Sequence, residues 1–204
     1  MFRHDILSKA LRDNQCFYLL DIGANNGDWA FTQKKFNPEI YVYCIEGNEK
    51  NAQELERRFL PYQITLLSDI ERDVKFYFNQ NDDNCTGMSY YIEKNDWYKP
   101  ENYIVLKTKT LEMLLNESDT TYDSMKIDTQ GSEIDILKGI GDYINNFKLI
   151  CLETSLEEYN VGSPEQDEVI KYMDSIGYKM SGICGESRYP DGKLFQQDLI
   201  FIKK

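Results

Sequence analysis

The stretch FYLLDIGANNG at residues 17–27 constrains the fold of this chain more than any other segment. Apolar residues that lead to Asp21, followed by Gly23 and Gly27, are typical of a buried parallel strand that turns sharply into a helix. Because glycine lacks a β-carbon, the backbone of such a turn can lie close to a ligand. Taken alone, the stretch is equally compatible with a plain strand and an ordinary Gly/Asn turn.

The length and the absence of a Pro-, Gly- or Ser-rich linker indicate a single domain over residues 1–204. Residues 1–12 have the apolar spacing of a short helix, and residues 73–108, with weak periodicity, are expected to be an embellishment of the domain. The longest apolar run, residues 40–45, is far shorter than the ~20 residues that a bilayer requires, and no leader opens the chain. We therefore expect a cytoplasmic protein without membrane insertion.

The charge and the reactive side chains exclude several classes of function. With 23 Lys and Arg against 35 Asp and Glu, the formal charge of −12 repels polyanions, so nucleic acid is not an expected partner. Five cysteines without a CxxC pair predict neither a disulfide framework nor a zinc site. The one histidine, His4, lies in the predicted N-terminal helix. A base in the centre of the fold must therefore be a carboxylate, Tyr, Lys or a metal-bound group.

Acidic residues follow successive predicted strands. They are Asp21, Glu46, Asp69, Asp128 and Glu153. In a parallel sheet these strand ends lie on one edge, where ligands of open α/β sheets bind. Glu46 follows the second strand, where a βαβ nucleotide fold has the carboxylate that binds ribose hydroxyls. Alternatively, Glu46 is a surface acid in front of a helix that Asn48 caps.

The remaining patterns predict a mostly parallel sheet. Strands are expected at residues 62–67, 74–78, 104–108, 122–127, 147–152, 178–184 and 197–202. No helix fits between the last two, so they should form an antiparallel hairpin. Thr110 is expected to cap one helix, and a capping box at Ser163 to Gln166 should start another.

The first turn differs from a dinucleotide fingerprint. GxGxxG would require a second glycine to admit a pyrophosphate, and this chain has Gly23-Ala24-Asn25-Asn26-Gly27. With seven strands and a C-terminal antiparallel hairpin, the pattern resembles the class I fold of methyltransferases that use S-adenosylmethionine (SAM), which carries no phosphate. This is a Rossmann-like α/β fold in which helices cover both faces of the sheet.

Four segments resemble the FkbM family of SAM-dependent methyltransferases more narrowly. They are DIGANNG (residues 21–27), KIDTQGSE (126–133), LKG (137–139) and QDLIFIK (197–203). The resemblance covers about residues 17–203 and is most specific at 126–139. It implies an O-methyltransferase acting on a hydroxyl of a sugar in a glycan, glycoconjugate or nucleotide sugar, or of another natural product. Two departures from the family pattern are Glu46-Gly47 in place of Glu-Pro and Glu112 in place of Asp.

The resemblance also implies roles for individual residues. The methionine end of SAM would be bound by the first turn, the ribose by Glu46 and its neighbours, and the adenine edge by Ser68 and Asp69. The expected cofactor-binding residues are Asp21, Gly23, Ala24, Asn25, Gly27, Glu46, Gly47, Asn48, Ser68 and Asp69. The expected acceptor contacts are Met88, Tyr90 and Gln130, with Trp97 and Tyr98 as further candidates.

Asp128 is the expected catalytic base, since it ends the predicted strand at residues 122–127, and Glu153 would assist it or orient the acceptor. Alternatively, Asp128 contacts only the cofactor or starts the next helix. A third hypothesis, which we do not favour, has Asp128 and Glu153 bind Mg²⁺ that acidifies the hydroxyl.

Two functions of other classes stay open at this point. One is a nicotinamide-dependent oxidoreductase, which the first turn disfavours. The other is a SAM-fold binding module without activity, which would be expected to lack the strand-end acids. Neither the acceptor, the number of methyl groups added nor the oligomeric state follows from the sequence.

Overall fold

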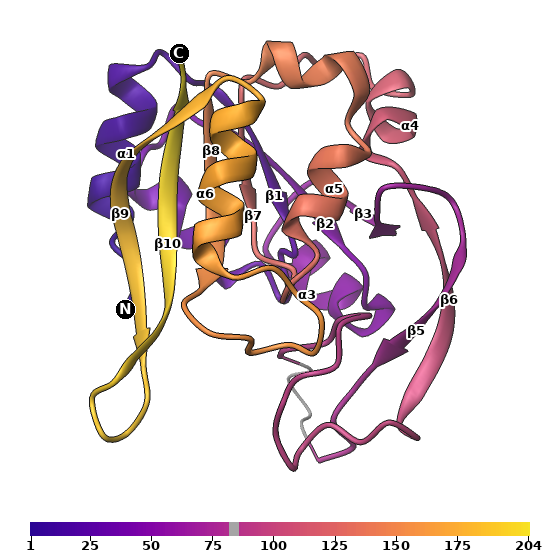
Figure 1. Ribbon diagram of the computed structural model, residues 1–204. Coiled ribbons are helices and arrows are strands. Elements are labelled where there is room, and N and C mark those ends of the chain that lie inside the picture. Colours follow the sequence, from indigo (N-terminus) through magenta and orange to yellow (C-terminus); the bar gives the residue numbers. More distant parts are fainter. Residues whose placement is uncertain (82–85) are drawn as a thin grey trace.

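The central element of the fold is a seven-stranded β-sheet with the strand order β3-β2-β1-β7-β8-β10-β9 (Figure 1). The computed structural model describes residues 1–81 and 86–204. The strands of this sheet are β1 (Tyr18–Ile22), β2 (Tyr41–Glu46), β3 (Tyr62–Ile64), β7 (Ser124–Ile127), β8 (Leu149–Ser155), β9 (Tyr178–Arg188) and β10 (Leu194–Lys203). Strand β10 is antiparallel to both of its neighbours, and the other pairs are parallel. The expected mostly parallel sheet with a C-terminal antiparallel hairpin is confirmed.

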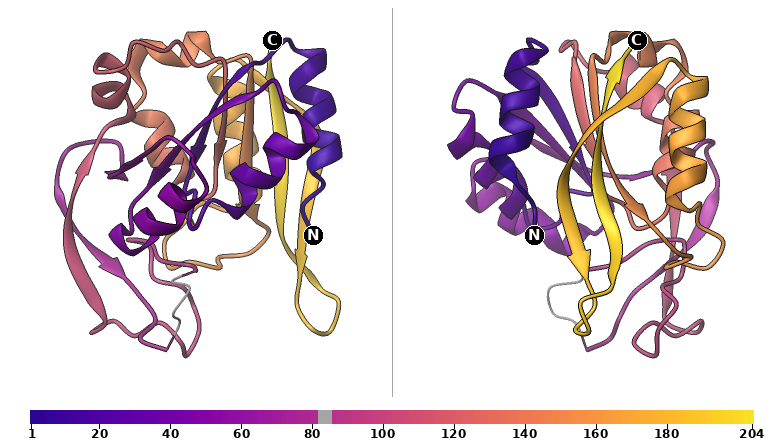
Figure 2. Two further views of the ribbon diagram at one scale, coloured as in Figure 1. Left: turned by 180° about the vertical axis from the view of Figure 1, so that it is seen from behind. Right: turned by 60° about the vertical axis from the view of Figure 1, so that its left-hand side comes forward.

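Helices cover both faces of the sheet, as expected (Figure 2). One face carries α1 (His4–Asp13), α2 (Asp28–Phe36) and α3 (Ala52–Arg57), with the 3₁₀ helix η1 (Glu49–Asn51) leading into α3. The other carries α4 (Leu111–Asn116), α5 (Glu133–Lys138), the 3₁₀ helix η2 (Gly141–Asn146) and α6 (Gln166–Ser175). Neighbouring side chains of a strand point to opposite faces, so Leu19 belongs to the first core and Leu20 to the second. Within the described residues, no helix is long and apolar enough to cross a membrane.

A smaller three-stranded sheet, in the order β4-β6-β5, is built largely from the expected embellishment at residues 73–108. Its strands are β4 (Leu66–Leu67), β5 (Asp73–Tyr77) and β6 (Tyr103–Lys109). Strand β5 is antiparallel to β6, as the alternating pattern of residues 74–78 predicts. Part of the polar run at 79–84, together with Cys85, lies outside the described residues.

The predicted third strand, residues 62–67, is wrong as a single element. Only Tyr62–Ile64 pairs with β2, whereas Leu66–Leu67 pairs with β6 in the smaller sheet. The backbone N–H of Thr65 donates to the carbonyl of Glu46 (2.8 Å), after which the chain leaves the large sheet. The backbone N–H of Ser68 then donates to the carbonyl of Lys109 (2.9 Å), so Ser68 and Asp69 follow a strand of the smaller sheet.

One of the two predicted helix caps has the expected residue. The side chain of Thr110 accepts the backbone N–H of Met113 (3.2 Å) at the start of α4. The capping box predicted at Ser163 is wrong, because α6 begins after Glu165, which forms the box with Glu168. The Ser163 hydroxyl instead donates to the carbonyl of Asn160 (2.8 Å), and Ser163 lies two residues before the N-cap position.

Gly23 allows the turns after β1 and β7 to touch. Its φ angle is +81°, and a β-carbon at this position would lie 1.9 Å from the carbonyl oxygen of Asp128. The backbone N–H of Gly23 donates to Ile45 (2.9 Å), and that of Asp128 donates to Ile22 (3.0 Å). The ends of three neighbouring strands are therefore held together at a position that only glycine fits.

We expect Gly23→Ala to prevent this approach and to lower the melting temperature strongly, because the clashing atom belongs to the backbone. Gly192→Ala is the matched control: Gly192 has a similar φ of +89°, but a β-carbon there meets nothing within 4 Å. The control should lose only about 1–2 kcal/mol from left-handed backbone strain. Thermal unfolding of both variants measures the difference, and equal losses would contradict the tight approach.

Candidate functional site

A cavity of about 210 Å³ opens at the carboxyl ends of β1, β2 and β7. The strand order reverses between β1 and β7, and ligands of open α/β sheets bind at such a point. The turns after these strands contribute Gly23, Asn25, Glu46, Gly47, Asp128, Thr129 and Gln130 to its wall. The smaller sheet contributes Leu66, Leu67 and Phe76, and the segment between its strands β5 and β6 contributes Met88 and Tyr90. The cavity thus lies between the large sheet and the segment of residues 66–109 that contains the smaller sheet, which we call the insertion.

Glu46 joins the turns after β1 and β2. Its carboxylate accepts the backbone N–H of Asn25 (2.7 Å) and that of Asn48 (2.8 Å), and only 7% of the residue is exposed. Burial raises the pKa of Glu46, although these hydrogen bonds oppose the shift. Asn48 does not line the cavity, and its side chain accepts the N–H of Lys50 at the start of η1. The capping role considered for Asn48 is therefore the one seen.

Asp21 does not line the cavity. Its side chain is fully buried and lies 3.9 Å from the ammonium nitrogen of Lys126, its neighbour on β7. Neither carboxylate oxygen has a hydrogen-bond partner among the residues that the structure describes. Desolvation raises the pKa of Asp21 to about 7, against the opposing effect of Lys126.

Asp128 and Glu153, two neighbouring carboxylates, have pKa values that are shifted in opposite directions. Although burial opposes ionisation, the Lys126 ammonium, 2.9 Å from Asp128, lowers the pKa of Asp128. Burial and the negative charge of Asp128 raise the pKa of Glu153 well above its usual value. The Gln130 amide donates to both, at 3.0 Å to Asp128 and 2.7 Å to Glu153. Of the two, Asp128 is therefore the acid that ionises more readily, and Glu153 is the one that holds its proton more strongly.

The loop after β7 is shaped by Glu133, the first residue of α5. Its buried carboxylate accepts the backbone N–H groups of Thr129 (2.9 Å) and Gly131 (3.2 Å). Between them, Gln130 has a φ angle of +58°, which few residues other than glycine adopt. Glu133 is thus a structural residue that holds Gln130 toward Asp128 and Glu153.

Asp198 is a third carboxylate that the sequence analysis missed as a site residue. Carboxylate oxygens of Asp128, Glu153 and Asp198 lie within 4.8 Å of one another, and oxygen ligands of this type suit Mg²⁺. Burial raises the pKa of Asp198 to about 7. Its position could have been found by pairing the predicted strand at residues 197–202 with the one at residues 147–152, because Asp198 lies opposite Glu153 on β8.

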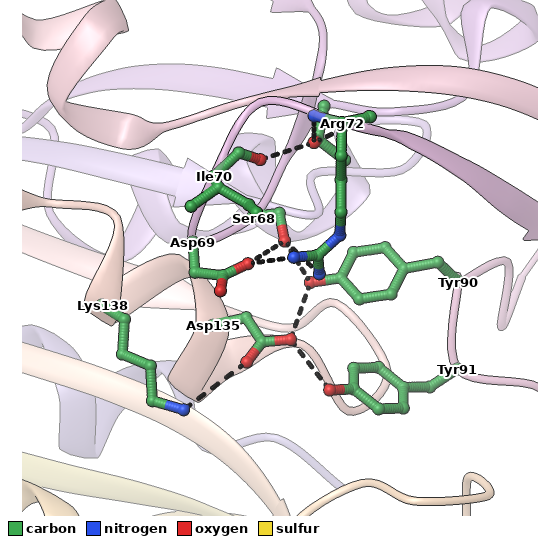
Figure 3. A network of polar contacts seen from close by, with 9 residues as sticks. Ser68, Asp69, Ile70, Arg72, Tyr90, Tyr91, Asp135 and Lys138 are labelled. Carbon is green, nitrogen blue, oxygen red and sulfur yellow. Dashed lines mark hydrogen bonds and ion pairs between the residues drawn. The ribbon is translucent and has the colours of Figure 1, made fainter.

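Ser68 and Asp69 lie outside the cavity, in a polar network that fastens the insertion to α5 (Figure 3). Arg72 contacts the Asp69 carboxylate at 2.7 Å and the Ser68 hydroxyl at 3.1 Å. The hydroxyls of Tyr90 and Tyr91 donate to Asp135 of α5, at 3.2 and 2.8 Å. The Tyr90 hydroxyl also lies 3.2 Å from that of Ser68. The network holds Tyr90 in the cavity wall.

The predicted site residues thus fall into two groups. The residues that line the cavity are Gly23, Asn25, Glu46, Gly47, Met88, Tyr90, Asp128 and Gln130. Those that do not are Asp21, Ala24, Gly27, Asn48, Ser68, Asp69 and Glu153. Gly27 precedes α2 with a φ angle of +79°, and Ala24 is buried in the first core. A direct contact of the second group with a ligand remains a prediction.

Comparisons with known proteins agree with this arrangement. Residues 21–180 match the family model described as Methyltransferase FkbM domain. The 2-O-methyltransferase NoeI of Sinorhizobium fredii is 19% identical over 173 residues, which are 78% of this chain and 71% of NoeI.

Solved methyltransferase structures share the fold. TrmK of M. capricolum, solved with S-adenosyl-homocysteine, has a TM-score of 0.58 and 12% identity, with 100% of this chain and 69% of TrmK covered. The precorrin-6y C5,15-methyltransferase of Geobacter metallireducens has a TM-score of 0.53 and 11% identity, with 98% and 87% covered. The chain therefore has the class I methyltransferase fold.

The buried Asp21 gives a testable pH dependence of stability. Its folded-state pKa of about 7 lies above the ordinary aspartate value of 3.8, so the stabilisation from its protonated form is complete below pH 3.8 and is lost as the pH rises through 7. Asn carries no charge at any pH. We expect Asp21→Asn to raise the melting temperature by roughly 5 °C at about pH 8.5, and much less at about pH 5.

Asp191→Asn in the exposed turn between β9 and β10 is the control and should change little at either pH. If Asp21→Asn destabilised the protein equally at both pH values, the ionised carboxylate would instead be required to compensate Lys126.

Proposed function

This chain belongs to the FkbM family of SAM-dependent methyltransferases, and on that basis we propose that it methylates a hydroxyl of a sugar. The family supports the enzyme class and the cofactor, and a nicotinamide-dependent oxidoreductase is set aside. NoeI is a 2-O-methyltransferase, which supports oxygen as the acceptor atom. The sugar as acceptor rests on the resemblance of the sequence motifs to the family, and a hydroxyl of a non-sugar natural product is the alternative.

The donor set of the cavity fits SAM. Gly23 and Asn25 line the cavity at the first turn, and the Glu46 carboxylate lies at the second, where it can accept hydrogen bonds from ribose hydroxyls. Leu66, Leu67 and Phe76 line the cavity with apolar surface suited to adenine. SAM would supply a methyl group that transfers to the acceptor oxygen as the bond between the methyl carbon and the sulfonium sulfur breaks, with S-adenosylhomocysteine as the leaving group.

Asp128 carries the proposed chemistry, because it lines the cavity beside Gln130 and the Lys126 ammonium lowers its pKa. Lys126 and Gln130 fix both oxygens of its carboxylate. We assign it to accept a hydrogen bond from the acceptor hydroxyl and to take the proton as the new C–O bond forms. The low pKa is sufficient, since a hydroxyl becomes strongly acidic once its oxygen gains a methyl group.

Glu153 has a different assignment. Its pKa is raised well above the usual value, it does not line the cavity, and it accepts the Gln130 amide at 2.7 Å and the Gln196 amide at 3.2 Å. We therefore assign Glu153 as a positioning residue that holds Gln130, in place of a second base.

The proposed function is tested by incubating the protein with radiolabelled SAM and a panel of glycans, nucleotide sugars and non-sugar alcohols. We expect transfer of label to a sugar oxygen. Asp128→Asn should lower turnover by a factor of 10² to 10⁴, on the order of a lost general base, while SAM affinity measured by calorimetry changes only a few-fold.

Glu153→Gln is the matched control, because glutamine resembles the protonated acid and should retain far more activity than Asp128→Asn. Near-normal turnover of Asp128→Asn would reject Asp128 as the base. Label found only on non-sugar alcohols would reject the sugar acceptor.

We expect catalysis to be independent of a divalent metal. The carboxylates of Asp128, Glu153 and Asp198 have the ligand chemistry for Mg²⁺, but the Lys126 ammonium already supplies positive charge 2.9 Å from Asp128. Turnover should therefore survive exhaustive dialysis against EDTA, and added Mg²⁺ should not increase it. Loss of turnover that Mg²⁺ restores would assign a metal to these carboxylates.

A further inference from the structure

A second cavity, of about 620 Å³, adjoins the first. The two share Thr86, Gly87 and Gln130. The amide of Gln130 donates to the Asp128 carboxylate at 3.0 Å, so the second cavity leads to the end of the first at which Asp128 lies. A molecule bound in the second cavity would therefore have one end close to the proposed base.

The wall of the second cavity combines side-chain amides with aromatic rings. The amides belong to Asn79, Asn81, Asn95 and Gln130, and the rings to Trp97, Tyr98 and Tyr159. Aromatic rings offer flat apolar faces, and amides offer both donors and acceptors, which together suit the C–H faces and hydroxyls of a sugar ring.

The charges around this cavity disfavour an anionic ligand. Glu93 lines it, and among the described residues of its wall there is no Lys or Arg to receive a phosphate. Lys94, next in the chain, forms an ion pair with Glu158. Lys99 belongs to an adjoining hollow that also contains Asp96. The formal charge of the whole chain, −12, adds to the repulsion.

The wall is built by contacts between two distant segments. The backbone N–H of Lys94 donates to Tyr159 and that of Val161 to Ile92, each at 2.8 Å, and the Tyr159 hydroxyl donates to Glu93. These bonds join residues 92–94 side by side to residues 159–161 without the help of a ligand, and Glu93 and Tyr159 of these segments line the cavity. The shape of the cavity is thus a property of the fold.

Trp97 has the most exposed aromatic ring in the wall of the second cavity. It is 70% exposed, and its ring stacks on no other ring in the described part of the chain. The Asn95 side chain accepts the backbone N–H groups of Trp97 (2.8 Å) and Tyr98 (3.1 Å), which fixes the turn that carries the indole. An exposed indole on a fixed turn at the rim of an amide-lined cavity is suited to stacking on a sugar ring.

We propose that the second cavity binds the acceptor, and that the acceptor is an uncharged saccharide, with Trp97 as the stacking platform. This deepens the proposed function and rests on it. A nucleotide sugar or sugar phosphate would place one or two phosphates in a cavity whose one charged lining side chain, among those described, is an acid. Gln130, which lines both cavities, would then lie between the acceptor and the cofactor.

The test compares probes that differ in charge. Neutral methyl glycosides of common hexoses, the matching hexose 1-phosphates and the matching UDP-sugars are titrated into the protein saturated with S-adenosylhomocysteine. Binding is followed by tryptophan fluorescence, which reports on Trp97 because the chain has two tryptophans, and by saturation-transfer NMR. We expect a neutral glycoside to bind at least tenfold more tightly than its phosphorylated counterparts.

Trp97→Ala should weaken binding of that glycoside at least tenfold, raise its KM with little change in kcat, and leave the affinity for S-adenosylhomocysteine within twofold. Phe59→Ala is the matched control, since Phe59 is 90% exposed and lines neither cavity, and it should change nothing.

Tighter binding of the phosphorylated probes, no binding of any neutral glycoside, or equal behaviour of the two variants would overturn the proposal. Failure of the parent protein to bind S-adenosylhomocysteine or to consume SAM would overturn the proposed function instead, so the two failures are distinguishable.

Discussion

The ammonium group of Lys126, buried in the middle of the large sheet, is the constraint on which the rest of the site depends. Only 2% of this residue is exposed, and removing an ammonium group from water costs several kcal/mol unless opposite charges compensate it. Asp128, 2.9 Å from the ammonium nitrogen, supplies that compensation, while the Asp21 carboxyl group lies 3.9 Å and the Trp29 ring 4.9 Å from the nitrogen. Because Lys126 lies opposite Asp21 in the pairing of β1 with β7, the register of these two strands decides which groups surround the ammonium.

The same lysine makes the carboxylates around it unequal. It stabilises the charge of Asp128, and the charge of Asp128 in turn keeps the proton on Glu153. Acids of similar position in the sheet therefore act differently: one can accept a hydrogen bond from a hydroxyl, and the other holds Gln130. Asp128 lies 2.9 Å from the Lys126 nitrogen, whereas burial and the charge of Asp128 raise the pKa of Glu153.

The order of strands and helices could be predicted because each element has a local pattern of apolar residues and turn residues. The break at Thr65 could not, since residues 62–67 read as one strand and the break is visible only in which neighbour each half pairs with. Ser68 and Asp69 were expected in the ligand site because they follow a strand, whereas Arg72 and Tyr90 bind them outside it. The cavity-lining turns were predicted because glycines and strand-end acids mark them directly, and Asp198 was missed because its partner lies on another strand.

The division of residues 62–67 between two sheets has a further consequence. Leu66 and Leu67 line the first cavity, yet their backbone belongs to the sheet of the insertion, and Thr65 forms the last bond to the large sheet. Thr65 alone separates β3 of the large sheet from β4 of the smaller sheet. Residues 73–108 contribute to both cavities, with Phe76 in the wall of the first and Trp97 in the wall of the second. A substitution in this segment can therefore change the surroundings of either cavity, although the turns after β1, β2 and β7 stay unchanged.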